Sequence, residues 1–306
     1  MFALLTFIAG LKGNKSVIFA MEEPEVALPP HTQRRVAEFV LGEMGQCIVT
    51  SHSPYVIEQF DPAQIAILDR DNAGKLAGLP IDGAQVKLNA LRAERRQFAE
   101  AVLSRAVLVV EGSTEAALFA AASTIMEQSR LPKQYTHFDL AGVSLFVASG
   151  DGDVPRHGPI FAVLGKLAFG FYDKPGAALG ADALAKLARF TKHWESPEKG
   201  IENLLVKGMP IAVVKRFLAD VKDRADYPAN AGAYNAAASD VEMAALATNV
   251  LKARKGEATK RSTAVKGPNG SWRAVADSKV DGSDEKIKDG KITASGNTTS
   301  WLHRCR

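Results

Sequence analysis

The sequence predicts an α/β protein built around parallel sheets, and three observations support this fold class. Short apolar runs alternate with segments of helical periodicity along most of the chain. Several of these runs are continuously apolar, which is typical of parallel strands that are covered on both faces. Hydrophobic residues make up 46% of the 306 positions and charged residues 24%, proportions that suit a globular chain with its own core.

The composition excludes several classes of protein. No apolar run approaches the roughly 18 residues that span a bilayer, so no membrane partner is expected. Residues 1–15 begin with an apolar run that lacks a basic start and a small-residue cleavage site, which favours a buried helix over a secretory signal. Cys47 and Cys305 are the two cysteines, too few for a disulfide framework or a four-cysteine zinc site. A reducing cytoplasm is the expected location.

The net charge of +4 is concentrated at the end of the chain. Residues 256–306 hold ten Lys/Arg and six Asp/Glu, which accounts for the whole excess. A neutral body with a basic tail permits a DNA partner without arguing for one.

Residues 1–91 predict strand, helix and strand in succession. The spacing indicates parallel pairing through a helical crossover. Strands are expected over 16–21, 46–51 and 64–68, and a helix over 31–45.

A second α/β pattern fills residues 106–205, after a charged helical connector over 92–105. Strands are expected over 106–112, 143–150 and 166–173, and helices over 113–128 and 180–194. Residues 206–258 predict a helical region. Residues 259–306 are rich in Gly, Ser, Thr, Asp and Lys, and they predict a disordered basic tail.

Paired carboxylates follow the first predicted strand, in the segment EEPE. Nucleotide hydrolases use such a pair, one acid for Mg²⁺ and the next to polarise the attacking water, which assigns these roles to Glu22 and Glu23. The next strand ends in TSHSP, where His52 can reach a γ-phosphate. The alternative is that two acids after a strand merely begin a solvated loop.

Together, EEPE and TSHSP resemble the Walker B segment and the switch-histidine loop of ABC-type ATPases of the OLD/RecF/SMC-like class. The resemblance covers roughly residues 1–70 and implies the C-terminal half of such a domain. No phosphate loop of the form G-x-x-x-x-G-K-[ST] occurs in the chain. ATP hydrolysis by this chain alone is therefore not expected, whereas ATP is implied as a ligand in the full-length context.

A further pair of acids follows the first strand of the second region, in VVEGSTE. Glu111 ends the strand, Gly112 permits a tight turn, and Glu115 lies one helical turn further on. Because parallel sheets place ligands beyond the carboxyl ends of their strands, both acids are candidate site residues. An acid that complements the helix dipole is the alternative; it explains Glu115 better than Glu111.

The strand-E-G-x-T-E pattern resembles a Toprim domain, the Rossmann-like metal-binding fold of topoisomerases, primases and OLD-family nucleases. The resemblance implies metal ligands at Glu111, Glu115 and Asp173. Pro175 stands where the family has the second aspartate of its D-x-D motif, so the metal site is either impaired or compensated. Asp151 and Asp153, in the preceding VASGDGD segment, are the candidate replacements.

Two later motifs resemble further elements of the family. GIENLLV makes Glu202 a candidate metal ligand, although an exposed acid in the first turn of a helix explains it equally well. VLKARKGE makes Lys255 a candidate catalytic cation for the transition state. Lys255 can equally be a solvated cation at a helix end or a phosphate contact.

An ATPase half followed by a Toprim domain is the order of the OLD (overcoming lysogenization defect) family. This resemblance implies a two-metal DNA endonuclease that uses Mg²⁺ or Mn²⁺, acts in phage defence and dimerises through its ATPase region. The pattern here suggests a truncated form of such an ATP-gated enzyme. The alternative is a catalytically silent remnant that serves in DNA binding or dimerisation.

Overall fold

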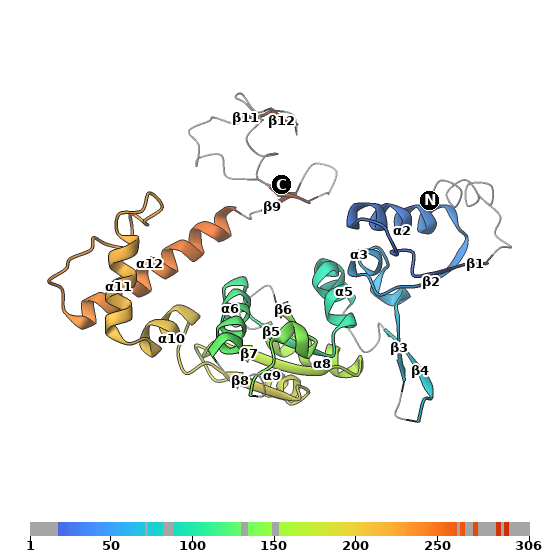
Figure 1. Cartoon of the computed structure of the whole chain (residues 1–306), viewed down its shortest axis with the longest axis horizontal. Coiled ribbons are helices and arrows are strands. Elements are labelled where there is room, and N and C mark those ends of the chain that lie inside the picture. Colours follow the sequence, from blue (N-terminus) through green and yellow to red (C-terminus); the bar gives the residue numbers. More distant parts are fainter. Residues whose placement is uncertain are drawn as a thin grey trace. The chain divides into compact units, whose positions relative to one another are not determined.

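The computed structural model describes residues 18–70, 73–81, 88–129, 134–148, 153–261, 264–266, 272–274, 286–288 and 291–293. The chain divides into two compact units, Met1–Ile201 and Glu202–Arg306. Figure 1 shows the elements of each unit in sequence colours. Both units are α/β or helical in their described parts, in agreement with the predicted fold class.

The chain begins its described part with a strand, a helix and a second strand: β1 (Ile18–Glu22), α2 (Pro30–Glu43) and β2 (Gln46–Thr50). The strands pair in parallel, as predicted, from Ile18 opposite Gln46 to Glu22 opposite Thr50. Phe19, on one face of this pair, packs against Val36 and Val40 of α2.

A short helical stretch and a hairpin follow: α3 (Pro54–Ile57), the 3₁₀ turn η1 (Pro62–Gln64), β3 (Ala66–Arg70) and β4 (Leu76–Pro80). The predicted strand over 64–68 is thus present but shifted, and it does not extend the parallel pair. Instead, β3 pairs with β4 in antiparallel fashion, a strand that the sequence pattern did not predict. Gly78 and Pro80 lie inside β4, and such residues weaken a strand signal.

The centre of the first unit is a four-stranded parallel sheet in the order β6-β5-β7-β8. Its strands are β5 (Ala106–Val110), β6 (Val143–Val147), β7 (Leu167–Tyr172) and β8 (Lys192–Glu195). All five residues of β5 are buried, which explains the continuously apolar run of this strand. Three of the four strands match predicted ones.

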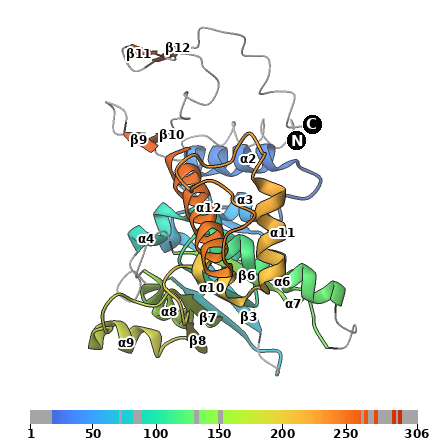
Figure 2. The same ribbon diagram turned by 90° about the vertical axis from the view of Figure 1, so that its left-hand side faces the viewer.

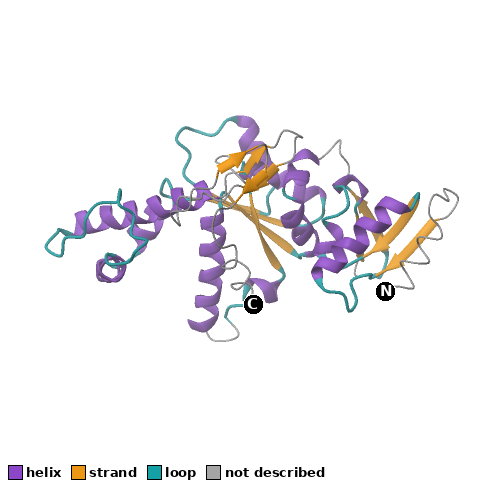
Figure 3. Cartoon of the chain, turned by 90° about the horizontal axis from the view of Figure 1, so that it is seen from above, coloured by secondary structure: helices purple, strands orange, loops and turns teal. Residues whose placement is uncertain are grey.

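Helices cover both faces of this sheet. Gly170 of β7 faces Phe190 on one side, whereas its neighbour Phe171 contacts Phe119 of α6 on the other, with the ring centroids 5.1 Å apart; Figure 3 shows the helices on both sides of the strands. The helices of the unit are α4 (Leu88–Ala93), α5 (Arg95–Leu103), α6 (Ser113–Ser129), α7 (Phe138–Ala141), α8 (Val154–Val163) and α9 (Ala181–Leu187).

The helix predicted over 180–194 is wrong in its second half. α9 ends at Leu187, and Lys192–Glu195 forms β8 on the edge of the sheet. Leu187 and Phe190 are buried against the core, so their apolar character reflects tertiary packing and not a continued helical stripe. Pairing with β7, from Phe169 opposite Lys192 onward, decides the strand.

The second unit is helical in its larger part. α10 (Ile201–Gly208) begins at the last residue of the first unit and is followed by α11 (Ile211–Val221) and α12 (Asp240–Arg261). α11 and α12 lie side by side (Figure 2), with Leu218 and Met243 in their shared core. The helical character predicted for residues 206–258 is confirmed.

The sequence predicts a disordered tail from residue 259 onward, whereas α12 continues to Arg261. The other described parts of the tail are four three-residue strands in two antiparallel pairs. These are β9 (Ala264–Lys266) with β10 (Trp272–Ala274), and β11 (Lys286–Lys288) with β12 (Lys291–Thr293). Within the described ranges, no helix combines the length and apolar character needed to cross a membrane.

Candidate active site

The first group of candidate residues lies where β1 and β2 end beside each other. Glu22, the last residue of β1, is opposite Thr50, the last residue of β2. The backbone N–H of Glu23 then donates to the carbonyl oxygen of Thr50 at 2.9 Å. The paired acids therefore lie next to the loop that carries His52.

Glu23 adopts an unusual backbone conformation, with φ at +42°. Left-handed geometry costs free energy for a residue with a side chain, and it persists where the surroundings enforce it. Oε1 of Glu23 lies 3.8 Å from Nε2 of His52, and both side chains are largely open to solvent. An acid and an imidazole held together at a surface can meet a ligand from solution.

Glu25 organises this site, although the sequence pattern assigned it no role. Its carboxylate accepts hydrogen bonds from the backbone N–H of His52 at 2.6 Å and from the hydroxyl of Ser51 at 3.0 Å. A carboxylate that accepts two such bonds stabilises the loop around them. The sequence offered one signal for Glu25, namely its place in the same EEPE segment as the paired acids.

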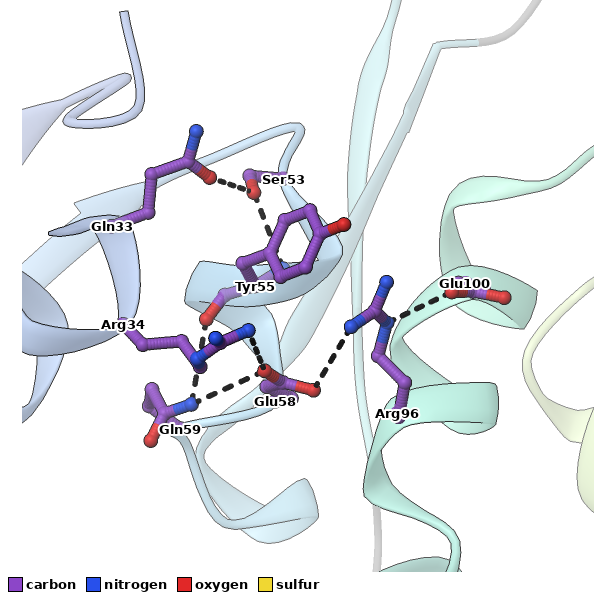
Figure 4. Close-up of polar contacts among 8 residues, drawn as sticks. All are labelled: Gln33, Arg34, Ser53, Tyr55, Glu58, Gln59, Arg96 and Glu100. Atoms are coloured by element: carbon purple, nitrogen blue, oxygen red, sulfur yellow. Dashed lines mark hydrogen bonds and ion pairs between the residues drawn. The ribbon is translucent and has the colours of Figure 1, made fainter. Parts of the chain in front are cut away.

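The segment Ser51–Tyr55, hereafter the histidine loop, is also tied to α2. The Ser53 hydroxyl donates to Oε1 of Gln33 at 2.5 Å and accepts from the backbone N–H of Tyr55 at 3.2 Å, as drawn in Figure 4. Ser53 is thereby the N-cap of α3. His52 itself stays exposed on a loop whose backbone is held on both sides.

The second group lies at the carboxyl edge of the parallel sheet. β5 and β7 are neighbours and pair in register from Ala106 opposite Leu167 to Val109 opposite Gly170. Glu111 follows β5 directly and Asp173 follows β7 directly. Because adjacent strands lie about 4.8 Å apart, residues that leave them at the same edge emerge close to one another.

Glu115 is part of the same edge and is only 2% exposed. A Cβ at Gly112 would lie 2.8 Å from Oε2 of Glu115, so the carboxylate folds back onto the turn between Glu111 and the helix. Burying a carboxylate costs free energy, whereas an acid that merely complements the helix dipole can stay in solvent. The burial of Glu115 therefore favours a role as a site residue over the alternative that it only complements the helix dipole.

The segment after β7 differs at one position from the D-x-D motif that it resembles. Asp173 is half-buried, and Pro175 lies two residues further on, in the loop that follows β7. Tyr172, just before Asp173, is buried, and this burial together with the nearby Glu195 raises the pKa of its hydroxyl. The strand end therefore presents one carboxylate where the family pattern has two.

Of the two candidate replacements, Asp153 is described and Asp151 lies outside the described residues. Asp153 precedes the first residue of α8 and forms an ion pair with Arg156. Its charge is therefore already balanced within its own helical turn.

The two later candidates lie in the second unit. Glu202 is buried in the first turn of α10, which does not fit the alternative of an exposed acid in that turn. Lys255 lies within α12, but its side chain is outside the described part of the structure. Their roles as metal ligand and catalytic cation remain predictions.

Among the residues that the structure describes, no three His, Cys, Asp or Glu side chains form a group that could hold a metal ion. The described part of the edge thus brings acids to one end of the sheet without completing a ligand set. Asp151 is not part of that comparison.

Neither the models of protein families nor the curated protein sequences contain a match to this chain. The chemistry of the site therefore has to be inferred from its own residues.

Proposed function

We propose that this chain is a metal-dependent DNA endonuclease of the OLD type that hydrolyses phosphodiester bonds at the carboxyl edge of β5 and β7. One observation carries the proposal: Glu111 and Asp173 follow two neighbouring parallel strands. The buried carboxylate of Glu115 at the Gly112 turn supports it. Ligands of open parallel sheets bind beyond this edge.

The type of donor at this edge suits a hard divalent cation, although the described acids do not complete a ligand group by themselves. Glu111, Glu115 and Asp173 offer carboxylate oxygens, which Mg²⁺ and Mn²⁺ prefer, and no thiolate accompanies them in the described residues. Glu111 and Asp173 would hold the ion, and Glu115 would add charge behind them. When bound, Mg²⁺ or Mn²⁺ would lower the pKa of a coordinated water molecule and stabilise the charge on the leaving oxygen.

Residues of the chain would position the scissile phosphate. The rigid strand ends fix the carboxylates, so that a scissile phosphate meets them in one arrangement. Lys255 is the proposed cation for the charge that develops on the phosphate. The basic tail, with ten Lys/Arg in residues 256–306, would add attraction to DNA that weakens with rising salt.

The first group has a separate role in this proposal. Glu22, Glu23 and His52 form the nucleotide side of an ATPase whose phosphate loop this chain lacks. The proposed full-length context is a cytoplasmic homodimer, paired through the ATPase region, in which ATP gates DNA cutting during phage defence. The contact between Glu23 and His52 supports this role.

Plasmid nicking tests the proposal directly. The purified chain is incubated with supercoiled plasmid and Mg²⁺ or Mn²⁺, without ATP. The wild-type chain is expected to nick plasmid. Glu111→Gln or Asp173→Asn should reduce nicking by more than about 100-fold, since even residues that only hydrogen-bond to metal ligands typically contribute 10- to 100-fold.

Glu115 and Glu127 provide a matched pair of variants on one helix. Both lie on α6, but Glu115 is buried at the site whereas Glu127 is exposed near the other end. Glu115→Gln should lower nicking and Glu127→Gln should leave it unchanged. Equal nicking by wild type, Glu111→Gln and Asp173→Asn would place the nuclease activity outside this edge.

A second candidate, a silent remnant that binds DNA or dimerises, is favoured by a different observation. Pro175 stands where the motif that this segment resembles has a carboxylate. Calorimetry with Mn²⁺ separates the two. A nuclease should show saturable Mn²⁺ binding that Glu111→Gln and Asp173→Asn abolish, whereas a remnant should show none.

A further inference from the structure

Helix α5 lies along the free edge of the parallel sheet. β6 is the first strand in the order β6-β5-β7-β8, so one of its edges has no strand partner among the described residues. Ala148 donates its N–H inward to the carbonyl of Val110 at 2.8 Å. The preceding Val147 N–H points to the opposite side, where Oε1 of Gln97 accepts it at 2.8 Å.

This hydrogen bond is located at the candidate site. Val147 is paired with Val110 in the last rung between β5 and β6, and Glu111 is the first residue after β5. A backbone N–H on an unpaired strand edge near the core needs a hydrogen-bond acceptor, and helices commonly cover such edges. Nε2 of Gln97 in turn donates to Oε2 of Glu94 at 2.8 Å, which orients the amide. Gln97 therefore holds the end of β6, which lies beside the end of β5 that Glu111 follows.

The adjacent residue, Arg96, connects α5 to the histidine loop. Its guanidinium carbon lies 4.1 Å from the centroid of the Tyr55 ring, within the range of a cation–π interaction. It also forms an ion pair with Glu58 at 3.9 Å, and its Nε donates to Glu100 at 2.8 Å. Figure 4 shows these side chains between α3 and α5.

Glu58 and Tyr55 extend the network to α2. Oε1 of Glu58 lies 3.7 Å from the guanidinium group of Arg34 on α2. The guanidinium carbon of Arg34 also lies 5.4 Å from the centroid of the Tyr55 ring. Burial lowers the pKa of Arg96, but its hydrogen bonds to Tyr55 and Glu100 outweigh this and raise it overall. The charge that joins the helices is therefore permanent at physiological pH.

Apolar packing makes the same junction stiff. Val56 of α3 is 1% exposed, and Ile57 packs against the core beneath the parallel sheet. Side chains in such packed interiors cannot shift independently, so small displacements are transmitted. The junction is continuous from the backbone of His52, held by Glu25, to the end of β6.

We propose that α5 is a positioning element that couples the histidine loop to the nuclease site, with Tyr55, Arg96 and Gln97 as its contact residues. A shift of the histidine loop moves α5 through Tyr55 and Arg96. Gln97 passes the movement to Val147 and thereby to the rung beside Glu111. The coupling deepens the proposed function, on which it rests, and it requires no contact between the two groups of acids.

Amide hydrogen exchange of the full chain tests the coupling without any requirement for catalysis. Gln97→Met removes the acceptor and calibrates the signal, and exchange at Val147 should rise by at least about tenfold. Tyr55→Leu is the decisive variant because it lies on the far side of the junction. Exchange at Val147 and Ala148 is expected to rise in it, while Gly170 in the sheet interior keeps its protection.

Two further variants sharpen the experiment. Arg35→Met, on α2 beside the network, removes only an exposed pair with Glu38 and should leave Val147 unchanged. Glu58→Gln weakens both ion pairs while keeping size, and it replaces Tyr55→Leu if that variant does not fold. Exchange at Val147 in the Tyr55 or Glu58 variant equal to that of Arg35→Met would overturn the coupling.

Nicking assays separate this inference from the proposed function. If wild type nicks plasmid, Tyr55→Leu should lower kcat while the KM for DNA stays unchanged, because the metal-binding acids shift but the DNA contacts do not. If wild type does not nick, the proposed function fails, and the exchange experiment still decides whether the histidine loop and the end of β6 move together.

Discussion

Oε1 of Glu25 accepts a 2.6 Å hydrogen bond from the backbone N–H of His52, across a separation of 27 residues. The acid-rich turn after β1 and the histidine loop after β2 are thereby a single structural unit. The two parallel strands alone bring these turns together, but Glu25 determines how the histidine loop is held. Its role is structural support for the exposed pair of Glu23 and His52.

Glu25→Ala should therefore destabilise the protein. The substitution leaves the exposed His52 N–H and the partly buried Ser51 hydroxyl without their acceptor, and the loss of such a hydrogen bond costs about 0.5–1.5 kcal/mol net. Urea unfolding followed by circular dichroism measures this loss. Glu38→Ala, which removes an exposed acid of α2, should change the free energy of unfolding by less than about 0.5 kcal/mol. Equal effects of the two variants would remove Glu25 from its supporting role.

The strain at Glu23 predicts an inversion of the usual glycine effect. At φ +42°, glycine avoids the steric cost that alanine pays, so Glu23→Gly should be more stable than Glu23→Ala by about 1 kcal/mol. Glu22, the last residue of β1, is the matched control, since Glu22→Gly should be less stable than Glu22→Ala by about 0.5–1 kcal/mol. Chemical denaturation of the four variants gives both differences. The same sign at both positions would contradict the strain.

Gly112→Ala should impair the site more than the fold. The new Cβ would lie 2.8 Å from Oε2 of Glu115, so this carboxylate must move out of its buried position. We expect Mn²⁺ affinity and nicking to fall by about 10-fold or more, as for displaced supporting groups of metal sites. Calorimetry and plasmid nicking report the change.

Gly42→Ala is the control for that substitution. Gly42 lies near the end of α2, and a Cβ there meets no atom within 4 Å. Alanine favours the helix by up to about 1 kcal/mol, so this variant should be as active as wild type and slightly more stable. Unchanged Mn²⁺ affinity in Gly112→Ala would show that Glu115 is not part of the site.

His157 should make the stability of the first unit depend on pH. Burial against Phe146 lowers the pKa of its imidazole from the ordinary 6.5. The unfolded chain therefore binds a proton below pH 6.5 that the folded chain does not. The free energy of unfolding should be highest above this pH and should fall as the pH drops through 6.5 toward the folded pKa.

Unfolding by urea at several values between pH 5 and 8 measures this effect. His157→Gln should flatten the pH dependence over that window, because the substituted side chain does not titrate. His193→Gln, on the exposed strand β8, should keep the pH dependence of wild type. A wild-type profile that rises toward acid pH would contradict the assignment to His157.

Local patterns were sufficient for most of the elements. β1, β2, β5, β6 and β7 are predicted by continuous apolar runs, and the parallel pairing of β1 with β2 follows from the helix between them. β8 was missed because Lys192–Glu195 has no strand pattern of its own. Its conformation depends on pairing with β7, which no local signal reveals.

For the candidate site, too, some features follow from the sequence and others only from the tertiary structure. The sequence by itself determined which acids follow apolar strands, Glu22, Glu23, Glu111 and Asp173, because burial of a strand shows directly in its composition. Only the tertiary structure decided that β5 and β7 are neighbours, that Glu25 holds His52 and that Gln97 holds Val147. These relationships join residues far apart in the chain, and strand order and long-range hydrogen bonds leave no periodic trace in a sequence.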